Sequence, residues 1–218
     1  MKSVIFDMDG TLFQTNKILE VALEDTFNHL ASVGQWEDAI PLDKFREIMG
    51  VPLPEVWATL LPNHSIEGRE QINDYFQKSL VENINSGKGA LYPNVEQVFA
   101  HLVNSGFSIF IASNGVPAYL NAIVDYYQLD NWVSETFSIE QIESYSKSDL
   151  VQHILHTYEI KEAVVVGDRI SDIKAAKDNR LTAVGCHFDF AKEEELSQAD
   201  YVIYDLMELH HLLSRICM

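Results

Sequence analysis

The sequence has little cysteine, few basic residues and no long apolar run. Only two of its 218 residues are cysteines, Cys186 and Cys217, and their separation does not match the spacing of metal ligands. This usage favours a reducing compartment, so we expect a cytoplasmic protein. The apolar stretches are too short to span a membrane, and three apolar residues after Ser3 are too few for a signal peptide. We therefore expect neither feature.

Basic residues are scarce relative to acidic ones. The chain has 15 Lys and Arg against 33 Asp and Glu, a formal net charge of -18 at pH 7. Such a field repels polyanions, which argues against nucleic-acid and anionic-membrane partners. A phosphorylated ligand would need local positive charge, from a metal ion or a well-placed lysine. Hydrophobic residues at 47% are ordinary for a soluble globular protein of one large domain, or of a domain with an insertion.

Short β-rich apolar runs alternate with helical patterns along much of the chain. This alternation predicts an α/β fold with a mostly parallel, Rossmann-like sheet. Helical patterns cover Val95–Asn104 and Lys147–Tyr158. The predicted strands are Val4–Phe6, Phe107–Ala112, Ala163–Val166, Leu181–Cys186 and Tyr201–Tyr204, with a weaker candidate at Thr136–Ile139.

Residues 15–89 interrupt this alternation. Apolar residues recur there at helical spacing, and we expect four helices before a flexible connection at residues 86–89. The chain then divides into an α/β core, residues 1–14 and 90–218, and an inserted helical subdomain, residues 15–89. Such an insertion follows the first strand and is expected over its carboxyl end. The alternative is a helical extension that only enlarges the core.

Two acids one residue apart, Asp7 and Asp9, end the first predicted strand. Clustered carboxylates at the end of a buried strand repel each other and lose hydration. A divalent cation or a tuned proton would resolve that conflict. The simpler interpretation is a turn after the strand, since Asp and Gly10 are common turn residues.

Two further predicted strands end in polar side chains. Ser113 and Asn114 follow the second strand, and Asp168 and Asp172 follow the strand Ala163–Val166. Ligands of open α/β sheets collect at the carboxyl ends of strands, so these side chains are candidates for one site. Each also has a structural explanation, since Ser113 and Asn114 suit a helix cap, Asp172 a helix N-terminus and Asp168 a turn. That all of them coincide by chance is much less probable than any single case.

Together, these motifs resemble the haloacid dehalogenase superfamily of phosphohydrolases. The resemblance rests on Asp7-Met8-Asp9-Gly10-Thr11, Ser113-Asn114-Gly115, Lys147 and Gly167-Asp168 with Asp172, in that order over nearly the whole chain. The inserted helices resemble the helical cap of the branch that holds phosphoglycolate phosphatases and β-phosphoglucomutases. The resemblance implies a Mg²⁺-dependent phosphatase that acts on a small phosphorylated metabolite.

The resemblance also implies roles for these residues. Asp7 would be the nucleophile, and Asp9 would protonate the leaving oxygen and then deprotonate water. Mg²⁺ would be held by Asp7, the Asp9 backbone carbonyl and Asp168. The residues implied to bind phosphate are Ser113, Asn114 and Lys147. Two more would support the site. Thr11 would orient Asp9 by hydrogen bonding, and Asp172 would lie next to the metal shell or bind the metal through water.

Lys147 departs from the family pattern, in which prolines closely follow the lysine. Here the chain reads Ser146-Lys147-Ser148-Asp149. The only other lysine between Ser113 and Asp168 is Lys161, which precedes a predicted strand and so lies at the wrong end of the sheet. This favours Lys147, and the alternative is an ordinary surface lysine.

Other activities stay open at this stage. A phosphomutase would share the aspartyl-phosphate but return the phosphoryl group to its substrate, and a non-catalytic phospholigand-binding module could use the same fold. Asp9 argues against dehalogenation, which needs no acid at that position. The roles of Gln14 and Arg46 are open, as is that of Met49–Pro52, which resembles a substrate-facing loop. We expect a monomer or a homodimer.

Overall fold

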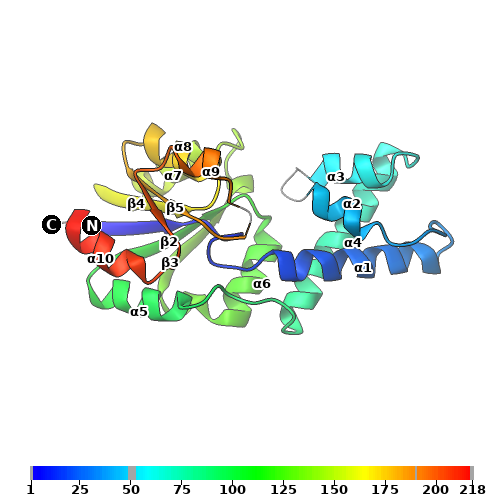
Figure 1. Ribbon diagram of the computed structural model, residues 1–218, viewed down its shortest axis with the longest axis horizontal. Helices are drawn as coiled ribbons and strands as arrows, with labels where there is room; N and C mark the ends of the chain where they lie inside the picture. Colours follow the sequence, from blue (N-terminus) through cyan, green and yellow to red (C-terminus); the bar gives the residue numbers. More distant parts are fainter. Residues whose placement is uncertain (1, 49–52, 190, 217–218) are drawn as a thin grey trace. The chain divides into compact units, whose positions relative to one another are not determined.

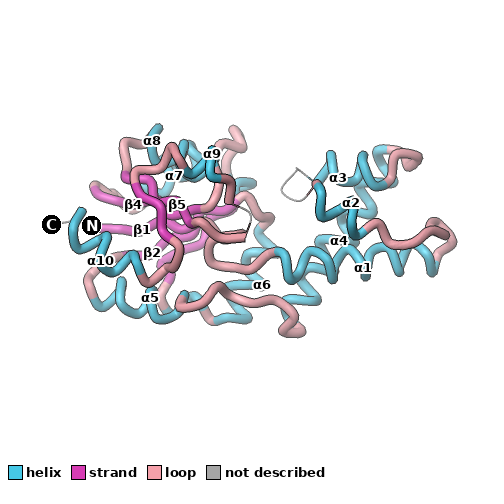
Figure 2. Tube along the Cα trace, viewed as in Figure 1, coloured by secondary structure: helices cyan, strands magenta, loops and turns pink. Residues whose placement is uncertain are grey.

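The computed structural model describes residues 2–48, 53–189 and 191–216. The chain forms two compact units, Met1–Gln14 with Ala90–Met218, and Thr15–Gly89. The first unit is an α/β unit and the second is helical, as the colours of Figure 2 show. In the described part of the chain, no helix is both long and apolar enough to cross a membrane.

The α/β unit is built on one parallel sheet. Within the described residues it has six strands in the order β3-β2-β1-β4-β5-β6, and every neighbouring pair is parallel. This order places β1 between β2 and β4, so the ends of these three strands lie together. The strands are β1 Lys2–Phe6, β2 Ser108–Ser113, β3 Val133–Ser138, β4 Glu162–Gly167, β5 Thr182–Cys186 and β6 Tyr201–Ile203.

Helices cover both faces of this sheet (Figure 1). Successive strand residues point to opposite faces, so β1 contributes to two cores. Ile5 belongs to an apolar cluster that contains residues of α7 and α8, whereas Phe6 packs on Phe99 of α5 at 5.3 Å between ring centroids. The helices of this unit are α5 Val95–Asn104, α6 Pro117–Tyr127, α7 Lys147–Thr157, α8 Ile170–Asp178, α9 Glu193–Leu196 and α10 Glu208–Ile216, with 3₁₀ turns η1 Leu129–Asn131 and η2 Ile139–Gln141.

The helical unit contains α1 Asn16–Ser32, α2 Leu42–Glu47, α3 Leu53–Leu60 and α4 Ile66–Asn85. α1 and α4 pack along each other through apolar faces that follow helical spacing. Asp25 of α1 also accepts hydrogen bonds from Ser79 and Asn83 of α4, at 2.9 and 2.6 Å. These hydrogen bonds join the two helices at defined positions within an otherwise apolar interface.

The two segments of the α/β unit meet where the helical unit is inserted. The Gln14 amide N–H donates to the Ala90 carbonyl at 2.8 Å, and the Gln14 side chain donates to the Leu91 carbonyl at 2.5 Å. The Tyr92 N–H donates to Leu12 at 2.8 Å. The chain therefore leaves the α/β unit and returns to it at adjacent points.

The predicted fold class, an α/β fold with a parallel sheet and a helical insertion after the first strand, is confirmed. The weakest predicted strand, Thr136–Ile139, begins earlier, at Val133. β3 is an edge strand with exposed Ser134 and Glu135 at its start, and these polar residues hide the strand pattern.

Candidate active site

The strand register brings the predicted polar residues to one edge of the sheet. Phe6 pairs with Val166 of β4 and with Ile111 of β2, so the residues that follow these three strands emerge together. The Asp7 N–H continues the ladder by donating to the Val166 carbonyl at 2.8 Å. Asp7 is thereby fixed beside the loop that carries Asp168.

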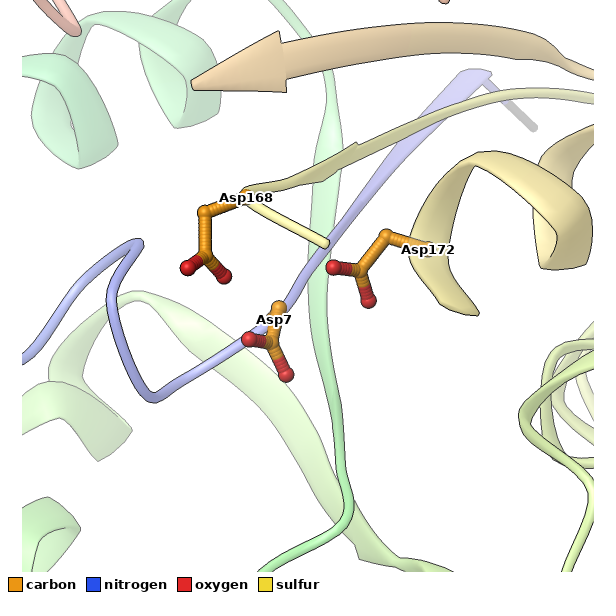
Figure 3. A group of neighbouring side chains, drawn as sticks. All are labelled: Asp7, Asp168 and Asp172. Carbon is orange, nitrogen blue, oxygen red and sulfur yellow. The ribbon is translucent and has the colours of Figure 1, made fainter. Parts of the chain in front are cut away.

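Three buried carboxylates gather at this edge. One oxygen from each of Asp7, Asp168 and Asp172 lies within 4.8 Å of the others. Figure 3 shows them converging from the end of β1, the end of β4 and the start of α8. The three residues are 6, 2 and 2% exposed, so water screens the repulsion between their carboxylates poorly. Among the described residues this is the one such group of three or more potential metal ligands.

Lys147 supplies a buried positive charge to this group. Its Nζ donates to Asp7 Oδ1 at 2.5 Å and forms an ion pair with Asp172 Oδ1. The residue is the first of α7, where a cation is disfavoured by the helix dipole, so the two carboxylates account for its position. Ser146 caps the helix, its side chain accepting from the Asp149 N–H.

The pKa values of these groups are shifted by burial and by each other. Loss of hydration is the main cause that raises the pKa of Asp168 to about 7, and the neighbouring Asp172 raises it further, against the opposing effects of Lys147 and Arg169. The pKa of Asp7 is also raised, by burial first, although Lys147 opposes the shift. Burial by itself would lower the pKa of Lys147, but Asp172 and Asp7 raise it, so the ammonium form persists.

This donor set fits a hard divalent cation. One ammonium faces three carboxylates, so excess negative charge remains in a buried space. Burial first and the neighbouring Asp172 second account for the raised pKa of Asp168. Carboxylate oxygens are the ligands that Mg²⁺ and Ca²⁺ prefer. A cation beside Asp168 would favour the ionised form of that group and lower its pKa.

Two glycines make room for the carboxylates. Gly10 has φ +78°, and a Cβ atom there would collide with the Asp168 carboxylate. A Cβ atom at Gly167 would collide in the same way with the side chain of Asp172. The backbone therefore approaches both acids more closely than any larger residue would allow.

The predicted phosphate-binding residues follow β2. Ser113 is buried, and its Oγ accepts the Gly115 N–H at 3.0 Å, whereas Asn114 is exposed. The Gly115 carbonyl accepts the Ser138 hydroxyl at 2.7 Å. The turn after β2 is thus held from both sides, by its own serine and by the end of β3.

Asp9 has a partner that the sequence analysis did not single out. The hydroxyl of Tyr119, in the first turn of α6, donates to Asp9 Oδ1 at 2.5 Å. The Thr11 hydroxyl, predicted to orient Asp9, lies 3.5 Å from Asp168 Oδ1, at the long limit of a hydrogen bond. Pro117 is a residue typical of a helix start, so the sequence could have indicated that Tyr119 lies in the first turn of a helix after Ser113. Nothing in the sequence indicates the contact between Tyr119 and Asp9.

The residues left open by the sequence now have positions. The Gln14 side chain joins the two segments of the α/β unit through Leu91. In the helical unit, Arg46 forms a two-pronged ion pair with Glu20, with two N–O distances of 2.7 Å. The predicted substrate-facing loop, Met49–Pro52, lies outside the described residues.

The fold and the acid cluster together define an α/β enzyme with a carboxylate-centred site at the carboxyl edge of its sheet. The chain belongs to the haloacid dehalogenase-like hydrolase family, which it matches over residues 4–186. The predicted family and the predicted hydrolase class are thereby confirmed.

The similar proteins differ in the activities that their names denote. The chain is 21% identical to a 5'-nucleotidase from Pseudomonas aeruginosa, over 97% of this chain and 95% of the relative. It is 27% identical to a phosphoglycolate phosphatase from Aquifex aeolicus, over 81% of this chain and 80% of the relative. A structure from Thermotoga maritima, described as a candidate β-phosphoglucomutase, superposes with a TM-score of 0.74 at 19% identity, covering 99% of this chain and all of the other.

Proposed function

We propose that this protein is a Mg²⁺-dependent phosphatase that hydrolyses a small phosphorylated metabolite through an aspartyl-phosphate on Asp7. One observation carries the proposal: the Asp7 carboxylate is buried, fixed by the Lys147 ammonium and surrounded by two further acids. A carboxylate held in one orientation is suited to attack phosphorus. The names of the relatives, a 5'-nucleotidase and a phosphoglycolate phosphatase, both denote enzymes that release phosphate from small phosphate esters.

In the first step, an Asp7 oxygen attacks phosphorus, and the bond between phosphorus and the leaving oxygen breaks. Asp9 gives its proton to the leaving oxygen, which departs as an alcohol. Asp7 then carries the phosphoryl group and Asp9 is ionised. Lys147, paired with Asp7 and Asp172, holds the nucleophile in place and adds positive charge beside the transferring group.

In the second step, Asp9 accepts a proton from water as the water oxygen attacks phosphorus. The acyl-phosphate bond breaks, inorganic phosphate leaves, and the Asp7 carboxylate and the protonated Asp9 are restored. The same residue therefore acts as acid and then as base, which balances the proton over one turnover.

Asp7, Asp168 and the backbone carbonyl of Asp9 would hold Mg²⁺, which when bound offsets the repulsion between the Asp7 carboxylate and an anionic phosphate. The Ser113 hydroxyl and the backbone N–H groups near Asn114 would bind the phosphoryl oxygens. Asp172 supports the site through its ion pair with Lys147 and by accepting the Arg169 N–H at 3.0 Å. Because the transition state for phosphoryl transfer is loose, positioning and charge stabilisation are expected to dominate the rate.

The test is phosphate release from a panel of small phosphate esters and pyrophosphate, with and without Mg²⁺. Phosphoglycolate, nucleoside monophosphates and hexose phosphates cover the main chemical classes. We expect Mg²⁺-dependent release from at least one compound, and no release by Asp7→Asn, a nearly isosteric change that keeps the fold. Asp130→Asn, an exposed aspartate of η1, is the matched control and should keep full activity.

Two outcomes would overturn the proposal. Isomerisation of hexose phosphates without phosphate release would assign a phosphomutase instead. Binding of phosphate esters with no turnover of any compound would assign a non-catalytic binding module.

A further inference from the structure

Tyr119 makes a direct contact with the acid that follows the nucleophile. Its hydroxyl donates to Asp9 Oδ1 at 2.5 Å, and the residue is buried, with 5% of its surface exposed. Both residues belong to the α/β unit. The contact joins α6, which follows the turn after β2, to the loop after β1.

The packing around Tyr119 fixes the position of its ring. The ring meets Phe13 edge-on, with centroids 6.3 Å apart, and Phe13 is fully buried. A Cβ atom at Gly115 would lie 3.1 Å from Tyr119 Cδ1, so the backbone of the turn lies directly against the ring. The Phe13 N–H donates to the Met8 carbonyl and the Gly115 N–H donates to Ser113 Oγ. Both neighbours of the ring are therefore held in place, and the Tyr119 hydroxyl has a defined position.

A phenol that donates to one carboxyl oxygen distinguishes the two oxygens of the group. The oxygen that accepts the hydrogen bond stays an acceptor, so an acidic proton on Asp9 is directed to the other oxygen, Oδ2. Proton transfer to a leaving group depends on the position of the oxygen that carries the proton. Tyr119 therefore has the geometry to decide which Asp9 oxygen exchanges protons.

We propose that Tyr119 is a positioning residue that holds Asp9 with Oδ2 as the proton-transferring oxygen. The inference rests on the proposed function, because it deepens the role of Asp9 as general acid and base. Tyr119 lies six residues after Ser113, so the same short segment carries the proposed phosphate-binding serine and the residue that orients the acid. Phosphate binding and proton transfer are thereby joined through one turn and the start of α6.

The test compares two leaving groups in Tyr119→Phe, which removes only the hydroxyl. An alkyl phosphate needs a proton on its leaving oxygen, whereas p-nitrophenyl phosphate does not, since nitrophenolate leaves unprotonated. We compare kcat/KM, because it reports the steps up to departure of the leaving group and excludes the later hydrolysis step, which both compounds share. We expect kcat/KM for the alkyl phosphate to fall about tenfold or more, a part of the 10²- to 10⁴-fold that general acids contribute. For p-nitrophenyl phosphate we expect a loss of kcat/KM below about threefold.

Tyr127→Phe is the matched control. Tyr127 lies on the same helix and packs against the same Phe13, at 6.1 Å between centroids, so a general disturbance of α6 would affect both variants. It should show no difference between the two leaving groups. Thermal melts of both variants report whether either substitution disturbs the fold.

Asp9→Asn separates this inference from the proposed function. We expect that variant to discriminate between the two leaving groups more strongly than Tyr119→Phe, and the double variant to be no worse than Asp9→Asn alone. Discrimination by Asp9→Asn but not by Tyr119→Phe would overturn the Tyr119 inference only. Equal losses of kcat/KM for the two leaving groups in Asp9→Asn would overturn the acid role of Asp9 and the inference with it.

Discussion

Lys147 Nζ lies 2.5 Å from Asp7 Oδ1, although the two residues are 140 positions apart in the sequence. The lysine also forms an ion pair with Asp172, so one ammonium joins the end of β1 to the start of α8. Both acids and the lysine are buried. The contact thus links the proposed nucleophile to a charge network whose members are costly to remove singly.

Replacing Lys147 should reduce both stability and activity. Lys147→Met keeps much of the side-chain volume but leaves two buried carboxylates without their cation, which typically costs about 3–5 kcal/mol. The penalty requires ionised carboxylates, so we expect it to be larger at pH 8 than at pH 5. Urea unfolding of the metal-free protein at both pH values measures it, and phosphatase activity should fall by about 100-fold or more.

Lys161→Met is the control for that experiment, because Lys161 is an exposed lysine just before β4. It should unfold and turn over like the unmodified protein. Equal stability of Lys147→Met and Lys161→Met at both pH values would show that the network around Lys147 does not stabilise the fold.

Asp168→Asn should stabilise the metal-free protein at pH 8. The pKa of Asp168 is about 7 in the folded state against an ordinary value of 3.8, so the folded state binds more protons between these values. Stability from this group is therefore present below about pH 4 and is lost as pH rises through 7. The neutral amide of Asn lacks this pH dependence. At pH 8 the thermal midpoint of Asp168→Asn should therefore be several degrees higher than that of the unmodified protein, since 1 kcal/mol corresponds to roughly 2–4 °C at this chain length.

Addition of Mg²⁺ should reverse that order. We expect the unmodified protein to gain stability from Mg²⁺, whereas Asp168→Asn lacks one of the proposed ligands and should gain little. A Mg²⁺ titration followed by thermal melting distinguishes the two. If Asp168→Asn gained as much from Mg²⁺ as the unmodified protein, Asp168 would not be a metal ligand.

Gly10→Ala should impair the proposed metal site more than the backbone strain alone explains. Gly10 and Gly106 both have positive φ, +78° and +81°, but a Cβ atom at Gly10 meets the Asp168 carboxylate, whereas one at Gly106 has nothing within 4 Å. Both alanine variants should lose about 1 kcal/mol from the unfavourable conformation. Only Gly10→Ala should also lose Mg²⁺-dependent stabilisation and activity. Equal behaviour of the two would mean that Asp168 can move away at no functional cost.

Much of this architecture could be predicted from the residues. Apolar runs predicted the strands, and the rule that parallel strands end at one edge predicted that Asp7, Ser113 and Asp168 lie close together. Those inferences depend on local patterns and on one general topological rule. The edge strand β3 was harder to delimit, because its polar first residues do not show the pattern of a buried strand.

The contacts between distant side chains could not be predicted in the same way. The pairing of Lys147 with Asp172 and the hydrogen bond from Tyr119 to Asp9 depend on how α6, α7 and α8 pack on the sheet. Helical spacing shows which residues share a face of a helix, but not which atom of another element that face will meet. For the same reason the sequence did not indicate that the Thr11 hydroxyl lies 3.5 Å from Asp168 Oδ1.

The most direct test of the central claim is chemical trapping of the phosphorylated residue. Borohydride reduces an acyl phosphate to an alcohol, so an aspartyl-phosphate becomes homoserine at that position, which peptide mass spectrometry identifies. During turnover with Mg²⁺ and a substrate from the panel, we expect homoserine at residue 7, and none without substrate or in Asp7→Asn. Efficient turnover with an unmodified Asp7, or with homoserine at another aspartate, would contradict the account.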